Sequence, residues 1–322
     1  MSASAQEVIT VALFTIMVVT DCIGNFLVIW IILTKNNMQS PMNYLLANLA
    51  VADIMVGGSI ASQFIISYLY THPTGLAGSY FCKFFTRGAI TWVGGAASVF
   101  SLAAISFDRY FAVLYPYSQT FKLNLKKVKR ITFFCWIFTL VLNIPLFLIL
   151  YYDEKNSQCM EKWPKRPSWF SKAYSIVWFV AAGCIPLVIM FYLYSRVIYR
   201  LWFKRSNHVP QVPGTQQAVM KARKRITKIV ITVSVLYGMT WMPSLTIYVL
   251  DRYDIVYNIG AKAFTINSLL VTFNSSINPF VYAFQSEKFR RHLKAFICCP
   301  RIIINQVDVG NEGQLQGTPQ QS

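Results

Sequence analysis

The residues best suited to chemistry in this sequence are charged and amide side chains set inside long apolar stretches. Asp53 and the neighbouring pair Asp108 and Arg109 are the charged members. The uncharged members are Asn25, Ser98, Asn274, Ser275 and Asn278. A charged side chain in hydrocarbon costs about 2.5–3.5 kcal/mol on insertion scales, so each of these groups needs a partner or a task. Two interpretations remain open: a hydrogen-bonded structural plug, or a site for water and a cation that changes with the state of the protein.

No catalytic pattern accompanies these groups. The three histidines, His72, His208 and His292, fall outside the apolar stretches and bring no nucleophile or metal-ligand pattern with them. Seven cysteines are too few for a disulfide-rich scaffold, and no Cys-x-x-Cys spacing occurs. We therefore expect that the chain is not an enzyme and holds no metal centre.

The apolar stretches have the length and number of membrane spans. Hydrophobic residues make up 55% of the 322 residues and charged residues only 13%. A helix needs about 20 apolar residues to cross some 30 Å of hydrocarbon, and only helices and closed barrels satisfy their backbone there. Seven stretches qualify: 8–34, 42–69, 84–113, 131–152, 173–202, 226–250 and 261–284. The sequence therefore predicts an all-α membrane protein built as a bundle of seven transmembrane helices.

The segments outside this bundle are short. Residues 1–7 are expected to be a short external N-terminus, and residues 8–284 the seven-helix domain. Residues 285–299 combine basic and aromatic side chains, which predicts an amphipathic helix on the membrane surface. Residues 300–322 are rich in Gln and Gly and are expected to be a disordered cytoplasmic tail.

The basic residues indicate how the bundle is oriented. With the N-terminus outside, 21 of the 30 lysines and arginines fall at the cytoplasmic face, as the positive-inside rule requires. They form short clusters between apolar stretches, so the net charge of +18 points to lipid surface and an acidic intracellular partner rather than to nucleic acid. An odd number of spans then places the C-terminus inside.

Short motifs in successive stretches carry a family resemblance. They are Gly24-Asn25, Asn48 to Asp53, Asp108-Arg109-Tyr110 with Pro116, Trp136 with Pro145, Pro186 with Tyr194, Trp241-Met242-Pro243, and Asn278-Pro279-Phe280-Val281-Tyr282. In this order and spacing the set resembles the rhodopsin-like (class A) G-protein-coupled receptors along nearly the whole chain. Residues 274–290 are most similar to neuropeptide receptors of the galanin and allatostatin sort.

The resemblance implies two working sites inside the bundle. A pocket for sodium and water would comprise Asn25, Asp53, Ser98, Asn274, Ser275 and Asn278, with sodium as an allosteric ligand and no other cofactor. The residues of activation and G-protein coupling would be Asp108, Arg109, Tyr110, Pro116, Tyr194, Trp241, Pro243, Asn278, Pro279 and Tyr282. Arg109 would be held by Asp108 at rest and released when the sixth span swings outward; a snorkelling interfacial arginine is the alternative.

The resemblance also implies covalent features, partners and a location. Cys82 and Cys159 would form a disulfide, and Cys298 and Cys299 would be candidates for palmitoylation. The partners would be an extracellular ligand, a heterotrimeric G protein, arrestin, a receptor kinase and membrane lipid. The location would be the plasma membrane, with several crossings and an extracellular N-terminus.

Three features depart from the family pattern. Cys82 stands 27 residues before Arg109, about two more than is usual, so the third span either contains a bulge or has a longer outer end. Arg223 stands where some members have an acidic partner for the arginine of the third span, so the resting state would depend on Asp108 alone. Asp21 lies in an apolar run one turn before Asn25, and it would either join the polar cluster through water or be protonated.

The ligand class follows mainly by exclusion. Receptors for amines in this family need an acidic residue in the outer third span, and residues 83–107 contain none. Opsins need a lysine in the seventh span, and residues 263–285 contain none. A neuropeptide is the preferred prediction, with a lipid or other small molecule as the first alternative and an ion-coupled secondary transporter as a remote one. The expected ligand pocket comprises Thr91, Trp92, Trp178, Tyr248, Asp251 and Ser268, although ordinary helix packing could explain each of them equally well.

Overall fold

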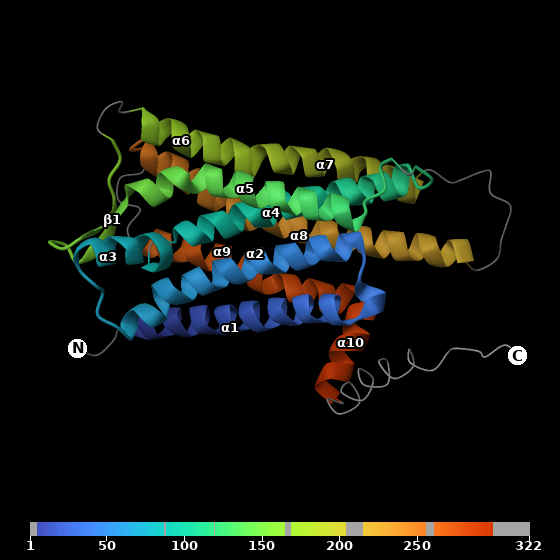
Figure 1. The fold of residues 1–322 in the computed structure, drawn as a ribbon, viewed down its shortest axis with the longest axis horizontal. Coiled ribbons are helices and arrows are strands. Elements are labelled where there is room, and N and C mark those ends of the chain that lie inside the picture. Colours follow the sequence, from blue (N-terminus) through green and yellow to red (C-terminus); the bar gives the residue numbers. More distant parts are fainter. Residues whose placement is uncertain are drawn as a thin grey trace, which may run out of the picture.

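The computed structural model describes residues 5–86, 88–118, 120–164, 169–203, 215–255 and 261–298. Within them, seven long helical segments lie side by side along the longest axis of the molecule (Figure 1). The first four are α1 (Ala5–Thr34), α2 (Pro41–Phe64), a third made of α3 (Gly75–Phe81), η3 (Cys82–Thr86) and α4 (Ala89–Leu114), and α5 (Leu125–Ile149). The fifth is made of α6 (Phe170–Trp178), η4 (Phe179–Cys184), α7 (Ile185–Ile198) and η5 (Tyr199–Phe203). The sixth and seventh are α8 (Thr215–Arg252) and α9 (Ala261–Gln285), and α10 (Glu287–Cys298) follows.

Six of these segments, in the part of the chain that the structure describes, are long and apolar enough to cross a membrane. The remaining one, α9, has 25 residues and is long enough. Its apolar character is reduced by asparagines and serines, among them Asn267, Asn274 and Asn278. Most of these polar residues are buried against other helices, so α9 is long enough to span the membrane with its polar face covered.

Several helix ends differ from the ends of the apolar stretches. α8 begins at Thr215, well before residue 226, because lysines and arginines are good helix formers that extend the helix beyond the apolar part. α5 occupies 125–149 rather than 131–152, and its last expected residues belong instead to the strand β1 (Leu150–Asp153). Hydropathy locates the part of a helix that lies in lipid, not the ends of the helix.

The third segment contains the bulge that its long spacing suggested. Residues Cys82–Thr86 form a π-helical turn, which takes up more residues per turn than an α-helix. Gly88 follows with φ +76°, and a Cβ there would lie 2.7 Å from Nε2 of Gln63. The extra residues between Cys82 and Arg109 are therefore accommodated by a local irregularity outside the regular helix α4.

Prolines interrupt four of the long helical segments. Pro145, Pro243 and Pro279 lie inside α5, α8 and α9, where each removes one backbone hydrogen bond. Pro186 lies in the first turn of α7, directly after the π-helical turn η4. Each of these four helical segments thus has a point at which it can bend.

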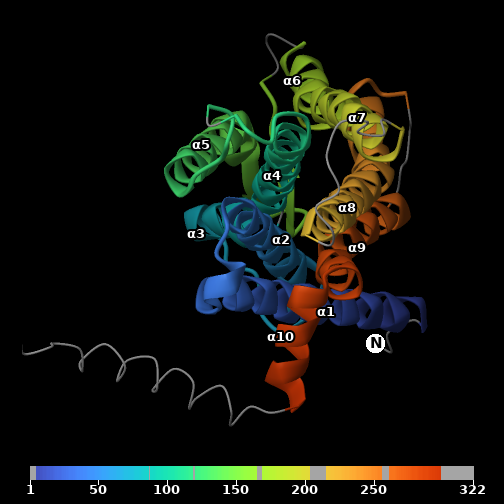
Figure 2. The same ribbon diagram turned by 90° about the vertical axis from the view of Figure 1, so that its right-hand side faces the viewer.

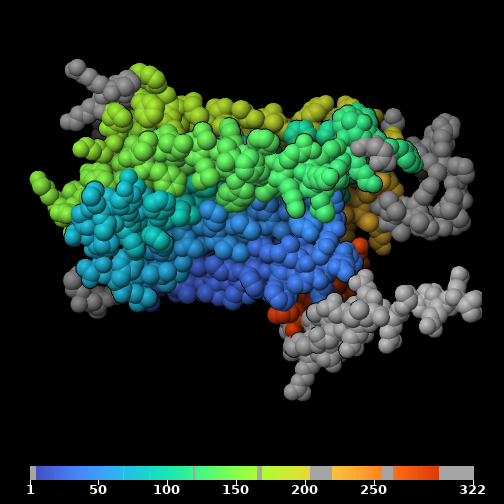
Figure 3. Space-filling model, viewed as in Figure 1, coloured from blue at the N-terminus to red at the C-terminus, as the bar shows by residue number. Residues whose placement is uncertain are grey.

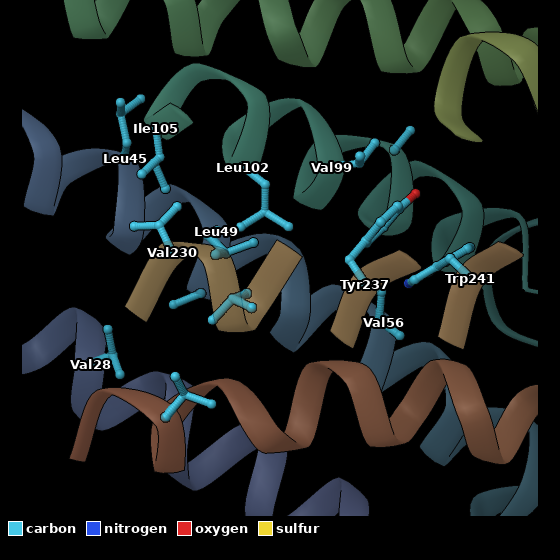
Figure 4. Packing of buried hydrophobic residues seen from close by; sticks show 14 of the residues in the cluster. Val28, Leu45, Leu49, Val56, Val99, Leu102, Ile105, Val230, Tyr237 and Trp241 are labelled. Carbon is cyan, nitrogen blue, oxygen red and sulfur yellow. The ribbon is translucent and has the colours of Figure 1, made fainter. Parts of the chain in front are cut away.

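The outside of the bundle is apolar, and a separate core lies within. Ile16, Val188 and Phe191 are more than 60% exposed, as residues that face lipid would be. The surface seen in Figure 3 is formed largely by α1, α2 and α5. Inside, side chains of α1, α2, α4 and α8 meet, including Val28, Leu49, Leu102 and Val230 (Figure 4). The bundle therefore packs apolar groups on both sides of each helix, as a membrane protein does.

A β-hairpin closes one end of the bundle. Strand β1 pairs antiparallel with β2 (Gln158–Glu161), so that Tyr152 lies opposite Cys159. The predicted disulfide between Cys82 and Cys159 is present and ties this hairpin to η3. The end of the bundle that carries the hairpin is the one expected to face outside.

The opposite end carries α10. In the end-on view of Figure 2, α10 leaves the bundle beside α1 and runs away from it. Phe289 of α10 is 4% exposed and packs into the core, while the basic residues beside it face outward. Residues 1–4 of the expected N-terminus, Cys299 and the expected tail 300–322 lie outside the described residues, as does His208.

Candidate functional site

A polar cluster surrounds Asp53 in the middle of the bundle. Asp53 is fully buried, and its Oδ2 accepts a hydrogen bond from Nδ2 of Asn278 at 2.7 Å. Its Oδ1 accepts one from Oγ of Ser98 at 3.3 Å. The structure therefore brings together one predicted residue from each of α2, α4 and α9, although they lie far apart in the sequence.

Asn25 and Asp21 extend this cluster onto α1. The amide of Asn25 donates to Oδ1 of Asp21 at 2.6 Å and to the backbone oxygen of Ser275 at 3.2 Å. Both residues are fully buried. Asp21 also lies against Gly57 of α2, where a Cβ would collide with its carboxylate. Asp21 therefore joins the polar cluster by direct contact with Asn25.

Several atoms of the cluster have no hydrogen-bond partner among the described residues. They are Oδ2 of Asp21, Oδ1 of Asn25, Nδ2 of Asn274 and Oδ1 of Asn278. Three of the four are oxygen acceptors, and hard cations and water are bound in proteins by oxygens of this kind. An unpaired polar atom in a dry interior costs about 1–3 kcal/mol. These three oxygens therefore fit a bound cation or ordered water.

Above this cluster lies a column of aromatic rings. The ring of Trp92 is 5.0 Å from that of Trp178, 5.2 Å from that of Tyr248 and 6.1 Å from that of Trp241. Trp241 in turn stacks on Tyr237 at 5.8 Å, and Figure 4 shows both side chains. Three of the predicted ligand-pocket residues therefore meet directly above Trp241.

The other three predicted pocket residues make different contacts. Thr91 is buried and donates to Oγ of Ser59 on α2 at 2.8 Å, so it faces the neighbouring helix. Asp251 is about half exposed at the outer end of α8. Ser268 is buried in α9, where its backbone oxygen accepts from Thr272. Asp251 also lies 3.4 Å from Arg252, whose guanidinium is over the ring of Tyr248.

Arg252 and Glu161 form an outer contact that sequence reasoning missed. Nη2 of Arg252 lies 2.8 Å from Oε2 of Glu161, which also accepts from Nε1 of Trp163 at 2.8 Å. The guanidinium lies 5.7 Å from the ring of Trp163 and 5.1 Å from that of Tyr248. Arg252 therefore docks the external hairpin on α8 directly above the aromatic column. A charge at the end of a strand and another at the end of a helix give no signal of pairing in sequence.

His72 lies beside the disulfide at the same end. Its Nε2 is 3.7 Å from Sγ of Cys82 and 3.6 Å from Sγ of Cys159. Thiolates bind metals well, but sulfurs joined in a disulfide are not thiolates. The imidazole is then the only strong metal ligand of this trio, so the trio forms no metal centre while the disulfide is intact.

At the opposite end, Arg109 faces a cavity of about 600 Å³. Its guanidinium is paired with Asp108, as predicted. Pro116, Arg223 and Tyr282 also line the cavity. The hydroxyl of Tyr282 is buried with no hydrogen-bond partner in the described part of the chain, whereas that of Tyr194 contacts Oγ of Ser234 at 3.1 Å. Tyr110 packs instead on the rings of Phe111 and Tyr115.

A second set of contacts, separate from the pair of Arg109 and Asp108, lies at the inner end of α8. Nη1 of Arg225, two residues beyond Arg223, lies 2.8 Å from Oε1 of Glu287. Its Nε also donates to the backbone oxygen of Gln285. The Arg225 guanidinium, by hydrogen bond and charge, lowers the pKa of Glu287 below its ordinary value. These contacts connect the inner end of α8 to the junction of α9 and α10. Comparing the residue type at position 223 with the family pattern could not reveal them, because they involve Arg225.

Comparison with known proteins agrees with the arrangement. The profile of the family described as "7 transmembrane receptor (rhodopsin family)" matches residues 24–282. The substance-P receptor of Rattus norvegicus is 29% identical over 312 residues, covering 92% of this chain and 73% of the receptor. The substance-K receptor of Mus musculus is 29% identical, covering 88% and 74%. The tachykinin-like peptides receptor 86C of Drosophila melanogaster is 27% identical, covering 91% and 59%.

Proposed function

Because this chain belongs to the rhodopsin family of seven-transmembrane receptors, we propose that it binds an extracellular peptide and activates a heterotrimeric G protein. Its relatives include receptors named for substance P, substance K and tachykinin-like peptides. Because the family and the relatives are receptors, the chain is a multi-pass membrane receptor and not an enzyme. The similarity to galanin and allatostatin receptors stays a prediction.

The observation that carries the proposal is the continuous run of contacts from the outer hairpin to Trp241. Glu161 of the hairpin and Trp163, two residues beyond it, contact Arg252. Arg252 lies over Tyr248, Tyr248 packs on Trp92, and Trp92 packs on Trp241. A peptide that enters beneath the hairpin must displace or tilt some of these rings. Large aromatic rings suit this task because they are rigid and make extensive contacts.

Movement of Trp241 would be passed on by α8. Trp241 packs so closely on Gly95 of α4 that a Cβ there would collide with the ring. Pro243 lies two residues further along α8 and weakens the helix at that point. A small rotation of Trp241 is therefore converted into a larger displacement of the inner end of α8, which opens the cavity around Arg109. The G protein would insert into this cavity and contact Arg109 once Asp108 has released it.

The polar cluster around Asp53 would set the resting state. We propose that sodium with water binds Asp53 and Ser98, near Asn274, Ser275 and Asn278. The buried oxygens without partners favour such an ion. The ion holds α2, α4 and α9 together, and its loss allows them to repack. A ligand or ion shifts such an equilibrium only through its different affinity for the two states.

Further assignments follow from the same proposal. The receptor would lie in the plasma membrane with its N-terminus outside, and it would be regulated by a receptor kinase and arrestin. Palmitoylation of Cys298 and Cys299, which follow the basic part of the sequence of α10, belongs to the same proposal. A lipid or other small molecule remains the alternative ligand. Family membership favours signalling over the secondary-transport alternative.

The test is a ligand screen in cells that express the chain with a promiscuous G protein. The probes are amidated peptides, free-acid peptides, small amines and lipids. We expect an amidated or free-acid peptide to raise second-messenger signalling. Arg109→Ala should abolish that signal and leave peptide binding largely intact, because Arg109 lies at the far end of the bundle from the hairpin.

Arg130→Ala is the matched control, because Arg130 is an exposed arginine at the inner end of α5. It should signal like the unmodified receptor. Signalling that persists in Arg109→Ala would refute the coupling mechanism. A response to lipids alone would refute the peptide assignment.

A further inference from the structure

The inner part of α8 has two opposite faces, and coupling uses only one of them. Ala222, Arg223 and Ile226 line the cavity beside Arg109. The other face carries Lys221, Lys224 and Lys228, spaced by three and four residues, together with Arg225, which lines the coupling cavity as well. Apart from Arg225, this second face has no role in the mechanism above.

The second face forms one wall of a basic groove. We define the basic groove by Trp202, Lys221, Lys224, Arg225 and Lys228, and its volume is about 600 Å³. Glu287 is its one acidic lining residue, and that carboxylate is already paired with Arg225. In the described part of the chain Lys221, Lys224 and Lys228 have no ion-pair partner. The described lining therefore keeps a net positive charge, because one carboxylate is set against three lysines and one arginine.

Trp202 closes the groove on the side of the fifth segment. It lies in the π-helical turn η5, and Nζ of Lys224 is 5.2 Å from its ring. The contact fixes Lys224 over the ring while its remaining donors stay available. Lys221 and Lys228 are exposed and can approach the same ligand from either side.

Toward the middle of the membrane the groove continues as an apolar hollow. This second hollow, of about 560 Å³, shares Trp202, Arg225 and Lys228 and is extended by Ile198, Phe203, Ile231 and Phe284. Phe203 and Phe284 are both 74% exposed, which places their rings on the lipid-facing surface. The combined surface is basic at its cytoplasmic end and apolar further in.

This distribution matches a phospholipid better than a soluble anion. A soluble phosphate compound would use only the basic end and would leave Phe203 and Phe284 without a role. The cytoplasmic leaflet contains anionic lipids that attract lysines and arginines near the membrane surface. Phosphate groups take several donors at once, and three lysines around one hollow can supply them.

We propose that the basic groove binds the phosphorylated headgroup of an anionic phospholipid, with the acyl chains along Phe203 and Phe284. Lys221, Lys224 and Lys228 bind the phosphate oxygens. Trp202 lies at the boundary between headgroup and chain, where tryptophans are favoured. The inference requires the membrane orientation of the receptor but neither its ligand nor its coupling.

The test measures lipid binding directly, in the absence of agonist and G protein. The full-length receptor in phosphatidylcholine nanodiscs is titrated with phosphatidylinositol bisphosphate, and bound lipid is counted by native mass spectrometry. K221Q/K224Q/K228Q should bind this lipid on the order of 100-fold more weakly, since each lysine near an anionic surface contributes about fivefold in affinity.

The matched control is K126Q/K129Q/R130Q, which removes the same charge from exposed residues at the inner end of α5. It should bind the lipid within about twofold of the unmodified receptor. Unchanged binding in K221Q/K224Q/K228Q would overturn the proposal. So would an equal loss in the control, which would indicate general attraction to surface charge.

A second arm separates a lipid from a free phosphate compound. Water-soluble inositol trisphosphate should bind more weakly than the lipid. F203S/F284S should lower the affinity for the lipid toward that of inositol trisphosphate and leave the soluble compound unaffected. If both probes bind equally well and F203S/F284S changes neither, the site binds a phosphate compound and not a lipid. Because no signalling is measured, failure here would leave the proposed receptor function intact.

Discussion

Arg252→Ala should lower the stability of the receptor by removing one partner of a buried ion pair at its outer end. The side chains of Arg252 and Glu161 are 19% and 15% exposed, so their ion pair is largely buried. Removing one partner of a buried pair costs about 3–5 kcal/mol, and the residual exposure favours the low end, about 3 kcal/mol. The two ring contacts of the guanidinium add about 0.5–1 kcal/mol each. The expected loss is about 4–5 kcal/mol.

The assay is thermal unfolding of the purified receptor in detergent. For chains of roughly this size a loss of 1 kcal/mol lowers Tm by about 2–4 °C, so Arg252→Ala should lower it by about 8–20 °C. Arg252→Lys should lose roughly half as much, because it keeps the charge but not the planar fork. In a double-mutant cycle with Glu161→Gln the two losses should not add, since both remove one interaction.

Asp251→Asn is the control. Asp251 is also near Arg252, at 3.4 Å, but it is 53% exposed, so its loss should cost about 0–1 kcal/mol. An Arg252→Ala receptor that unfolds within about 2 °C of the unmodified one would refute the claim that this arginine docks the hairpin. If Arg252→Ala and Asp251→Asn lost the same stability, the burial of the pair between Arg252 and Glu161 would not be the reason for its strength.

Three further predictions test the interior and the inner face. Sodium chloride should stabilise the purified receptor relative to choline chloride, by about 1.4 kcal/mol at a tenfold excess over Kd, and Asp53→Asn should remove that gain; equal salt responses would contradict the sodium site. Gly95→Ala should cost about 1–3 kcal/mol of stability and change basal signalling, because its Cβ collides with Trp241, whereas Gly58→Ala, with nothing within 4 Å of the added Cβ, should stabilise α2 slightly; the reverse order would contradict the packing. Because the pKa of Glu287 is lowered from its ordinary value of 4.5, the ion pair with Arg225 stabilises the receptor fully above pH 4.5 and is lost only as pH falls through the lowered pKa. The difference in basal signalling between Glu287→Gln and the unmodified receptor should therefore stay constant from about pH 5 to 8. A difference that vanishes near pH 6 would contradict this prediction.

Much of the fold could be predicted because lipid imposes strong local rules. Every helical span has to satisfy its own backbone, so long apolar stretches located all seven helices. The buried contacts among Asp53, Ser98 and Asn278 were also predictable, because polar residues are rare in spans and therefore conspicuous. The disulfide between Cys82 and Cys159 followed from the family resemblance and is present.

The sequence was less informative where geometry depends on other segments. Spacing showed that extra residues lay between Cys82 and Arg109, but not that a π-helical turn accommodates them. That irregularity ends at Gly88, and in the α-helix that restarts there Thr91 donates to Ser59 of α2, a contact that the spacing did not indicate. The contacts of Arg252 with Glu161 and of Arg225 with Glu287 join segments far apart in the chain, and single charged residues do not announce such partners.

The central claim is that the inner end of α8 moves outward to admit a G protein around Arg109. The most direct test is the distance between spin labels at Met220 of α8 and Lys126 of α5, both exposed at the inner face, in a receptor lacking other reactive thiols. Nucleotide-free heterotrimeric G protein serves as the probe. The account predicts a longer distance when the G protein is bound and no lengthening in Arg109→Ala. A bound G protein with the distance unchanged would contradict it.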